Sequence, residues 1–366
     1  MDSIEDIAGP ALLLDRDALD RNIQAVAKIA RGQGVAWRPH VKAHKCSTLG
    51  RLLIAAGAIG QSCATLREAE TMAAAGIGGI LLTSPLATPA QFERLAKLLR
   101  SGADVSVVAD DARAVDPLAG VARGAGTEIG VLVDVDVGQN RTGVRDIAQA
   151  VVLAGRVQST KGLRYDGVQV YYGHLQQTVP MSERATAVGR QHERIADLLQ
   201  RLRQSDAAPR IVTGSGSGTS LMDARSGLFT ELQPGSAFMM DASYSKTLIG
   251  ADGTCPFEVS LFVQADIISA TGPGLAVVNA GTKALATDAG LPMIVGAEWA
   301  GWTYAFSGDE HGVLGARDGV KSSAPWGRQV RLVTPHCDPT VNLYDRFHVI
   351  RGENVVDTWA IDGRGY

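Results

Sequence analysis

The chain has 366 residues, of which 45% are hydrophobic and 20% charged, and its formal net charge is −3 at pH 7. This composition excludes a disordered chain, a coiled coil and a small disulfide scaffold, and the absence of a basic stripe argues against a nucleic-acid partner. The longest apolar runs, such as residues 11–14, fall far short of the ~20 residues that span a bilayer, so we expect no membrane partner.

Short apolar runs alternate with helical patterns from residue 35 to about residue 240. Strands are predicted over residues 35–42, 60–64, 80–84, 105–110, 129–137, 168–173, 211–214 and 231–240. Several of them are continuously apolar, which is typical of a parallel sheet buried on both faces. Amphipathic spacing predicts helices over residues 16–30, 67–75, 89–100 and 182–204, and residues 13 and 14 could form an earlier strand. Eight strand–helix units predict a (β/α)8 TIM barrel over residues 13–243, with a doubly wound open sheet as the alternative.

The pattern changes after residue 243. Runs typical of β-strands occur at residues 260–270, 275–279, 329–333 and 347–351, separated by Gly, Pro and Asp. We therefore expect a mainly β domain over residues 244–366, joined by residues 1–12. The four cysteines form neither a CxxC motif nor a secreted framework, and the first residues are acidic, so a cytoplasmic location without a signal peptide is predicted.

In a barrel, functional residues gather at the carboxyl ends of the strands. The first predicted strand ends in the stretch RPHVKAHK, residues 38–45. Lys42 closes the apolar run and should point inward, where desolvation can remove its charge and make its amine a nucleophile. Lys45 falls in the following loop and is expected to be solvated. A basic solvent-exposed loop is the alternative interpretation of the whole stretch.

Two further strand ends carry polar side chains. The stretch DVGQNRTG, residues 136–143, follows the fifth strand and places Arg141 where a guanidinium can hold an oxyanion or a phenolate. The sixth strand ends in Tyr171, Tyr172 and, after a glycine, His174. These groups can donate hydrogen bonds or transfer protons, although a core tyrosine is an equally good interpretation for either phenol.

The stretch after the seventh strand, TGSGSGTS, alternates glycine with hydroxyl residues in front of a predicted helix start. Such a loop presents backbone N–H groups and hydroxyl donors to a phosphate, and barrels often bind phosphate after strands seven and eight. A flexible linker is the alternative. We define this segment, residues 213–219, as the glycine loop, and its candidate ligand residues are Thr213, Gly214, Ser215, Gly216, Ser217, Gly218 and Thr219.

The β domain contains a candidate metal motif, PHCDPTVNL, at residues 335–343. In an extended backbone His336 and Asp338 would share one face while Cys337 points the other way. One nitrogen and one carboxylate suit Mn²⁺, Mg²⁺ or Zn²⁺, with water or substrate completing the site. Asp309 and His311 form a second polar cluster that could line the site or support the ligands, with an exposed turn as the alternative.

Taken together, these motifs resemble the fold-type III pyridoxal-phosphate enzymes, and within them the D-threonine aldolase / D-serine dehydratase family. The resemblance covers nearly the whole chain in order, starting with residues 9–15. It implies that Lys42 binds pyridoxal 5′-phosphate (PLP), that Arg141 approaches its phenolic oxygen and that the glycine loop holds its phosphate. His40 and Tyr171 are further candidate PLP contacts. Asp338 at the second metal position is similar to the aldolase branch, because the dehydratase branch carries cysteine there.

The resemblance implies a PLP- and metal-dependent lyase, with Mn²⁺ the expected metal, that cleaves D-β-hydroxy-α-amino acids to glycine and an aldehyde. His174 is the candidate base for the β-hydroxyl proton, with Tyr172 and a metal-bound hydroxide as rivals. A D-serine or 3-hydroxy-D-aspartate dehydratase is the first alternative, and an amino-acid racemase or a non-catalytic PLP-binding protein is the second. Fold-type III relatives suggest a homodimer.

Overall fold

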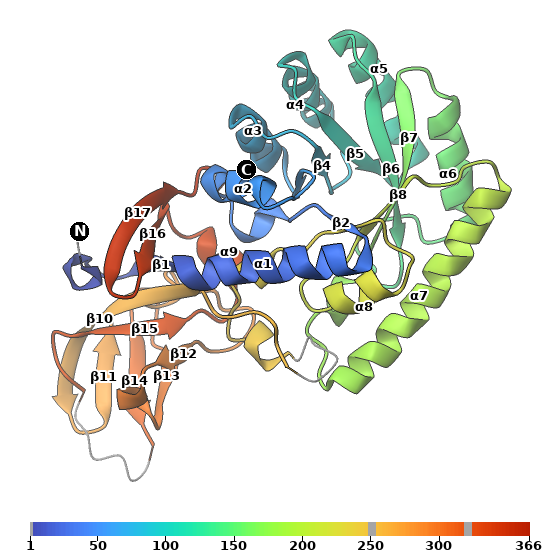
Figure 1. Cartoon of the computed structure of the whole chain (residues 1–366). Helices are drawn as coiled ribbons and strands as arrows, with labels where there is room; N and C mark the ends of the chain where they lie inside the picture. The colour runs from blue at the N-terminus through green and yellow to red at the C-terminus, as the bar shows by residue number, and fades with distance from the viewer. Residues whose placement is uncertain (1–2, 248–253, 318–323) are drawn as a thin grey trace.

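A computed structural model describes residues 3–247, 254–317 and 324–366 and contains a barrel and a second, mainly β unit (Figure 1). Eight parallel strands form the barrel sheet in the order β2-β9-β8-β7-β6-β5-β4-β3. They are β2 (Ala36–Trp37), β3 (Gln61–Cys63), β4 (Ile80–Leu82), β5 (Val105–Ala109), β6 (Ile129–Asp136), β7 (Leu163–Tyr171), β8 (Ile211–Gly214) and β9 (Glu231–Leu232). The predicted (β/α)8 barrel, with all eight of its strands, is therefore confirmed.

The barrel closes between β2 and β3 by isolated hydrogen bonds instead of a continuous ladder. The N–H of Ile59 donates to the carbonyl of Trp37 at 3.0 Å, and the N–H of Ser62 donates to the carbonyl of Pro39 at 2.9 Å. Proline interrupts the ladder at this point because it has no N–H to donate. The seam therefore depends on side chains for additional support.

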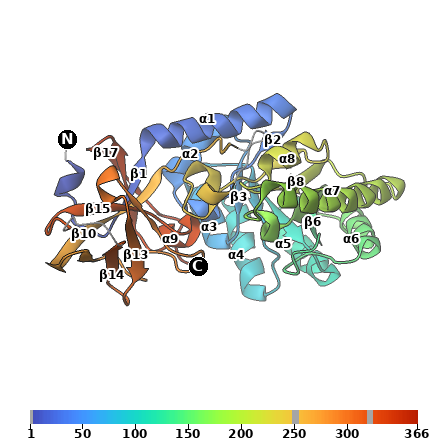
Figure 2. The ribbon, with the colours of Figure 1, turned by 90° about the horizontal axis from the view of Figure 1, so that it is seen from below.

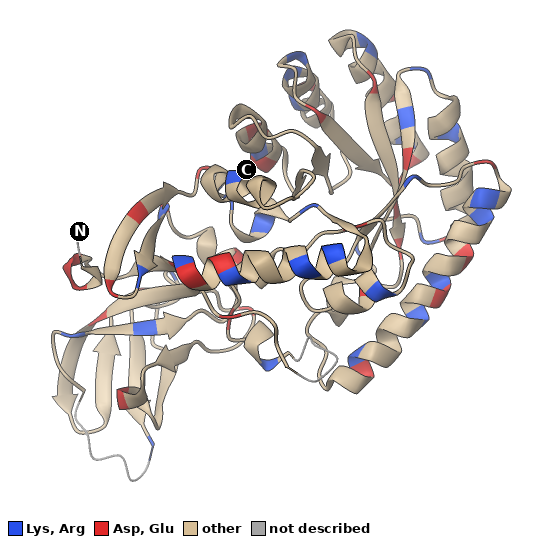
Figure 3. Ribbon diagram, viewed as in Figure 1, with Lys and Arg blue, Asp and Glu red and all other residues tan. Residues whose placement is uncertain are grey.

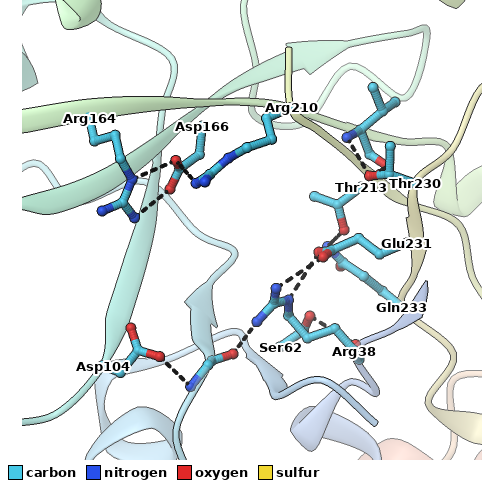
Figure 4. Close-up of polar contacts among 12 residues, drawn as sticks. Arg38, Ser62, Asp104, Arg164, Asp166, Arg210, Thr213, Thr230, Glu231 and Gln233 are labelled. Atoms are coloured by element: carbon cyan, nitrogen blue, oxygen red, sulfur yellow. Dashed lines mark hydrogen bonds and ion pairs between the residues drawn. The ribbon is translucent and has the colours of Figure 1, made fainter. Parts of the chain in front are cut away.

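Arg38 supplies that support from inside the barrel (Figure 4). Its Nη2 pairs with Glu231 Oε2 at 2.9 Å, and its Nη1 donates to the carbonyl of Gly79. A Cβ at Gly60 would lie 1.9 Å from that same carbonyl oxygen, so the seam requires glycine there. Bidentate contact between a guanidinium and a carboxylate fixes geometry as well as charge, and it joins β2 to β9 beside the closure.

Two predicted strands are much shorter in the structure than residues 35–42 and 231–240. β2 ends at Trp37 and β9 at Leu232, because Pro39 and the Pro234–Gly235 pair cannot continue a parallel ladder. Lys42 consequently lies on a single 3-10 turn, Val41–Ala43, and not at the end of a strand. A second 3-10 turn, Ser236–Phe238, follows β9.

Helices cover the outside of the barrel sheet (Figure 1). They are α1 (Arg16–Gln33), α2 (Ser47–Ala55), α3 (Leu66–Ala74), α4 (Pro89–Arg100), α5 (Val115–Ala125), α6 (Ile147–Ser159), α7 (Met181–Gln204) and α8 (Ser220–Arg225). The four helices predicted with bounds correspond to α1, α3, α4 and α7; only the start was predicted for α8, and no bounds were predicted for α2, α5 and α6. Basic and acidic residues are interspersed along α7 (Figure 3). None of the helices in the described parts of the chain has the length and apolarity needed to cross a membrane.

The second unit contains the nine-stranded sheet that was predicted only in outline. Its strands are β1 (Ala11–Asp15), β10 (Leu261–Gly272), β11 (Leu275–Val278), β12 (Met293–Val295), β13 (Trp302–Phe306), β14 (Gly312–Ala316), β15 (Gln329–Val333), β16 (Arg346–Arg351) and β17 (Asn354–Ala360). β1 pairs antiparallel with β10 and parallel with β16. Residues 13–15, which we expected in the barrel, therefore pair within this sheet.

The two units meet along α1 (Figure 2) and around the 3-10 turn Val41–Ala43, which we call the lysine turn. The short helix α9 (Cys337–Val341) of the second unit packs against the 3-10 turn that carries Lys42. After β17 the chain returns to the barrel, where Asp362 accepts hydrogen bonds from the N–H of Ser47 at 2.9 Å and from its hydroxyl at 2.6 Å. These contacts bring the candidate metal motif to the barrel mouth.

Candidate active site

A pocket at the mouth of the barrel brings together residues from motifs that lie far apart in the sequence. Of the candidate residues, it is lined by His40, Lys42, Arg141, Tyr171, Ser215, Gly216 and Ser217. The other lining residues are Ala64, Thr83, Ser84, Thr142, Gln169, Gln233, Gly235, Ser236 and Tyr244. The pocket therefore combines the lysine turn, the loop that carries Arg141, the end of β7 and residues 215–217 of the glycine loop.

Lys42 forms an ion pair with the candidate metal motif. Its Nζ lies 3.0 Å from Asp338 Oδ2. The negative charge of Asp338 raises the pKa of Lys42 and outweighs the opposing effect of burial. Burial alone would raise the pKa of Asp338, but the positive charges of Lys42 and His336 hold it well below its usual range. In this structure the carboxylate of Asp338 therefore favours the charged form of Lys42, whereas the sequence prediction considered only the effect of desolvation.

Lys45 is buried, contrary to the prediction that it is solvated. Its Nζ lies 2.6 Å from Glu68 Oε1, and Glu68 Oε2 accepts a hydrogen bond from the N–H of Ala64 at 2.7 Å. Burial of an ammonium group requires such a partner, because an unpaired charge inside a protein is costly. Lys45 therefore has a structural role, and Lys42 is the lysine of this stretch that reaches the pocket.

His40 is held as a neutral imidazole beside Lys42. Its Nδ1 accepts a hydrogen bond from the N–H of Lys42 at 3.3 Å, and its Nε2 lies 3.2 Å from the hydroxyl of Thr83. That hydroxyl donates to the carbonyl of Cys63, so His40 Nε2 must be the donor to Thr83. Burial, helped by the charge of Lys42, lowers the pKa of His40 well below its usual value. His40 can therefore pack against a bound ring without adding charge.

Gln169, which lines the pocket, and its hydrogen-bond partner Asp134 were not singled out from the sequence. Gln169 Nε2 donates to Asp134 Oδ1 and to the carbonyl of Thr83, both at 3.0 Å. Gln169 Oε1 is buried without a hydrogen-bond partner. Burial raises the pKa of Asp134 to about 6, although hydrogen bonds from Gln169 and Thr142 oppose the shift. The sequence signal was present: Asp134 lies between two valines of β6, and Gln169 lies between two valines of β7.

Asp134→Asn should change how stability depends on pH. The pKa of Asp134 is raised from 3.8 to about 6, so between these values the folded protein keeps a proton that the unfolded chain releases. Wild-type stability should therefore fall as pH rises through this window, by up to ~3 kcal/mol. Because asparagine does not titrate, the stability of Asp134→Asn should not fall in this pH window. Denaturant unfolding of both proteins at pH 4.5, 5.5 and 7 measures the effect, and a stability difference independent of pH would contradict it.

The glycine loop faces the pocket at its front and is tied to the barrel at its back. Ser217 Oγ accepts a hydrogen bond from the N–H of Ala237 at 2.8 Å, and the N–H of Gly218 donates to Gln176 Oε1 at 3.0 Å. A Cβ at Gly216 would lie 2.4 Å from Gln176 Oε1, and one at Gly218 would lie 1.7 Å from the Gln176 carbonyl oxygen. Only glycine allows the loop to approach Gln176 so closely.

The remaining glycine-loop candidates support the loop from behind. The hydroxyl of Thr213 lies 2.8 Å from Gln233 Nε2, which donates to it, and Gly214 ends β8. The hydroxyl of Thr219 donates to Asp223 Oδ2 at 2.6 Å. Residues 215–217 are therefore the part of the loop that faces the pocket.

Tyr172 is not in the pocket, and we withdraw it as a base candidate. Its side chain is fully buried, and its hydroxyl donates to Asp223 Oδ1. His192 Nε2 lies 2.9 Å from the same oxygen. Burial raises the pKa of Tyr172 well above its usual value, and the nearby charge of Asp223 adds to this shift. The phenol is part of the barrel wall behind the glycine loop. Adjacent residues of a strand point to opposite faces, and it is Tyr171 that faces inward.

Three other candidates lie outside the pocket. His174 is exposed, on the 3-10 turn Gly173–Leu175 that follows β7, close in sequence to Tyr171. Asp309 and His311 are also exposed. The carboxylate of Asp309 lies 3.8 Å from Lys283 Nζ. This cluster is therefore a surface turn between β13 and β14, and the expectation that it lines the site or supports the metal ligands is wrong.

The candidate metal motif differs from the predicted extended segment. His336 is extended, but Asp338 already belongs to the first turn of α9. Asp338 Oδ1 accepts hydrogen bonds from Ser236 Oγ at 3.0 Å and from Cys337 Sγ at 3.3 Å, so the thiol does not point away from the carboxylate. His336 Nδ1 lies 2.7 Å from Asp288 Oδ2, a residue that the sequence did not single out. Within the described residues, no group of three or more His, Cys, Asp or Glu side chains is arranged to hold a metal, so substrate or water must complete the site.

The residues present fit both groups that the sequence resemblance implies. For PLP, the pocket provides a lysine amine and a buried acceptor, Gln169 Oε1, that has no protein partner. It also provides a loop whose Gly216 and Gly218 leave no room for a Cβ beside Gln176. For a divalent metal, an imidazole nitrogen and a carboxylate are the donor set that Mn²⁺ and Zn²⁺ accept. Both sets of residues meet at the ion pair between Lys42 and Asp338.

Comparison with known proteins shows similarity over both units. The family model described as the alanine racemase N-terminal domain matches residues 14–243, and that of a putative serine dehydratase domain matches residues 260–350. The D-threonine aldolase of an Arthrobacter species is 38% identical over all of this chain and 95% of its own length. The 3-hydroxy-D-aspartate aldolase of Paracoccus denitrificans is 35% identical over all of this chain and 94% of its own length. The crystal structure of D-threonine aldolase from Filomicrobium marinum, at 36% identity, has a TM-score of 0.94 and covers 99% of this chain and 97% of that one.

Proposed function

This chain belongs to the D-threonine aldolase family of fold-type III PLP-dependent lyases, and we propose that it is a metal-assisted aldolase for D-β-hydroxy-α-amino acids. The proposed reaction breaks the Cα–Cβ bond and gives glycine and an aldehyde. The relatives just described are named as aldolases for D-threonine and for 3-hydroxy-D-aspartate. Mn²⁺ is the proposed metal, with Mg²⁺ and Zn²⁺ as the alternatives.

One contact carries this proposal: Lys42 Nζ lies 3.0 Å from Asp338 Oδ2. The contact places the metal motif of the β unit beside the lysine of the barrel. A racemase or a PLP carrier has no use for a nitrogen–carboxylate pair at this position, whereas a reaction at a β-hydroxyl has. A substrate whose amine takes the place of the Lys42 amine would have its β-hydroxyl within reach of His336 and Asp338.

The chain's own residues bind and orient the reactants. Lys42 provides the amine that holds PLP, and residues 215–217 of the glycine loop would receive its phosphate. Arg141 lies over the ring of Tyr171, with its Cζ 5.4 Å from the ring centroid, and both line the wall beside the proposed cofactor ring. When bound, PLP supplies an electron sink for the electrons released from the Cα–Cβ bond.

The second half of the site acts on the β-hydroxyl. A divalent ion held by His336 and Asp338 would supply a Lewis acid that lowers the pKa of this hydroxyl. Ser236 Oγ donates to Asp338 Oδ1 at 3.0 Å, which leaves Oδ2 as the carboxylate oxygen that faces Lys42. His174 remains our candidate for the proton acceptor, because its exposed side chain lies on the 3-10 turn that follows β7, close in sequence to Tyr171.

A product assay tests the proposal. The PLP-loaded protein is incubated with D-threonine and with 3-hydroxy-D-aspartate, with Mn²⁺ or with EDTA, and glycine, aldehyde, 2-oxo acid and ammonia are quantified. Glycine and aldehyde in equal amounts, lost with EDTA, are the expected result. A four-carbon 2-oxo acid with ammonia would instead support the dehydratase, since that reaction expels the hydroxyl group and leaves the carbon skeleton intact.

Gly218→Ala should weaken PLP binding. The new Cβ would lie 1.7 Å from the carbonyl oxygen of Gln176, so the glycine loop must move away. Hydrogen bonds to a charged group contribute roughly 1.5–3 kcal/mol, so we expect the dissociation constant of PLP to rise about 10- to 100-fold. Titration of the apoprotein with PLP, followed by absorbance, measures it.

Gly189→Ala is the matched control for this substitution. Gly189 lies in α7, and a Cβ there would meet no atom within 4 Å. Alanine at a helical position should raise stability by up to ~1 kcal/mol and leave PLP affinity unchanged. Wild-type PLP affinity in Gly218→Ala would show that the loop does not hold the phosphate.

We also propose that the protein is a cytoplasmic homodimer. The family resemblance supports the dimer, and four free cysteines are consistent with a reducing compartment. Light scattering coupled to size-exclusion chromatography measures the mass directly, and a monomer at micromolar concentration would contradict the dimer.

A further inference from the structure

His336 is held by a carboxylate that lies outside the metal motif. Its Nδ1 lies 2.7 Å from Asp288 Oδ2. The imidazole side chain is 24% exposed and the carboxylate 54% exposed. Because Nδ1 is engaged with Asp288, Nε2 is the ring nitrogen left for a metal. The contact therefore fixes both the tautomer and the direction of the ring.

The residues just before Asp288 are hydrogen-bonded to the metal motif and to Tyr344, which follows it. The segment that carries Asp288 lies between β11 and β12. The N–H of Ala286 donates to the hydroxyl of Thr340 at 3.0 Å, and the hydroxyl of Tyr344 donates to the carbonyl of Ala284 at 2.8 Å. Thr340 in turn donates to the carbonyl of His336 at 2.8 Å. Asp288 thus comes from a segment that is docked on α9, and its carboxylate is not a freely moving surface group.

The exposed ion pairs at residues 309–311 can be compared with the pair between Asp288 and His336. There, Lys283 Nζ lies 2.8 Å from Glu310 Oε1 and 3.8 Å from Asp309 Oδ2. All three side chains are more than half exposed, and such pairs contribute little. The pair between Asp288 and His336 differs because one partner is a proposed metal ligand. Its effect should appear in metal binding and not in the stability of the fold.

We propose that Asp288 is a positioning residue of the metal site, which orients His336 Nε2 toward the metal held with Asp338. This inference rests on the proposed function, because it requires that His336 binds a metal. Carboxylates that accept a hydrogen bond from a ligating histidine orient its ring and make the ligand nitrogen more basic, and their loss typically costs 10- to 100-fold in metal affinity or activity. Asp288 does not contact the substrate in this role.

The test is a titration of the PLP-loaded protein with Mn²⁺, followed by calorimetry or by electron paramagnetic resonance of free Mn²⁺. Four proteins are compared: wild type, Asp288→Ala, Asp288→Asn and the surface control Asp309→Asn. We expect the dissociation constant to rise 10- to 100-fold in Asp288→Ala. Asp288→Asn should recover part of this loss, because its amide oxygen can still accept from Nδ1–H. Asp309→Asn should bind Mn²⁺ like the wild type.

Activity measured against Mn²⁺ concentration adds a second readout. Asp288→Ala should need more Mn²⁺ for half-maximal activity, while kcat at saturating Mn²⁺ stays within about threefold of wild type, since Asp288 acts only through His336. Equal Mn²⁺ affinity in wild type and Asp288→Ala would overturn the inference alone, and so would an equal loss in Asp309→Asn. A wild-type protein that binds no Mn²⁺ would overturn the metal part of the proposed function, and the inference with it.

Discussion

Lys42→Ala is expected to abolish both aldol cleavage and the visible absorption band of the PLP-loaded protein. Lys42 is the lysine that lines the pocket, whereas Lys45, three residues later, is buried against Glu68. Loss of a covalent catalytic amine removes a group that acts throughout the reaction, so the expected decrease in kcat is on the order of 10³-fold or more. The absorbance spectrum after dialysis and the product assay measure the two effects on the same sample.

Lys97→Ala is the control for this experiment, because Lys97 is an exposed residue of α4 that pairs only loosely with Glu93, at 3.7 Å. It should retain both the absorption band and the activity. If Lys42→Ala keeps an absorption band that survives dialysis, another amine holds PLP and our assignment is wrong.

Asp338→Ala is expected to retain the absorption band and lose the metal-dependent part of the activity. A Lewis acid at the β-hydroxyl contributes several kcal/mol to transition-state stabilisation, which corresponds to a decrease of about 10²- to 10⁴-fold. His336→Ala should behave in the same way. The rate of glycine formation is measured with excess Mn²⁺ and with EDTA for each variant.

The comparison with EDTA-treated wild type makes this prediction specific. Both variants should be about as slow as the wild type in EDTA and should respond little to added Mn²⁺. Asp309→Asn, which changes a carboxylate in the same unit, should respond as the wild type does. Mn²⁺ stimulation of Asp338→Ala equal to that of the wild type would remove this carboxylate from the metal site.

The motifs that the sequence revealed are local ones. The lysine turn, the glycine loop and the motif at residues 335–343 each carry their functional side chains within ten residues, so the spacing of these residues identifies them. Strand count was equally accessible, because continuously apolar runs separated by helical patterns are typical of a parallel barrel. The bounds of β2 and β9 were overestimated because prolines end the ladder before the apolar pattern ends.

The errors share a different physical origin. In a barrel both faces of a strand are buried, so alternation does not tell which of Tyr171 and Tyr172 points inward. Lys45 was expected in solvent because its partner, Glu68, is 23 residues away. Asp288 lies 48 residues before His336 in a segment without regular structure. Pairs of this kind form only when the chain folds, so no local sequence pattern predicts them.

The ion pair between Lys42 and Asp338 has a consequence for how the two cofactors bind. One carboxylate oxygen cannot serve an ammonium group and a metal ion equally well, so engagement of the Lys42 nitrogen by PLP would draw it from Asp338 and leave this carboxylate free for the proposed metal. The two binding equilibria are then thermodynamically linked. Whatever factor PLP adds to the affinity for Mn²⁺, Mn²⁺ must add to the affinity for PLP, so each cofactor should be harder to remove when the other is present.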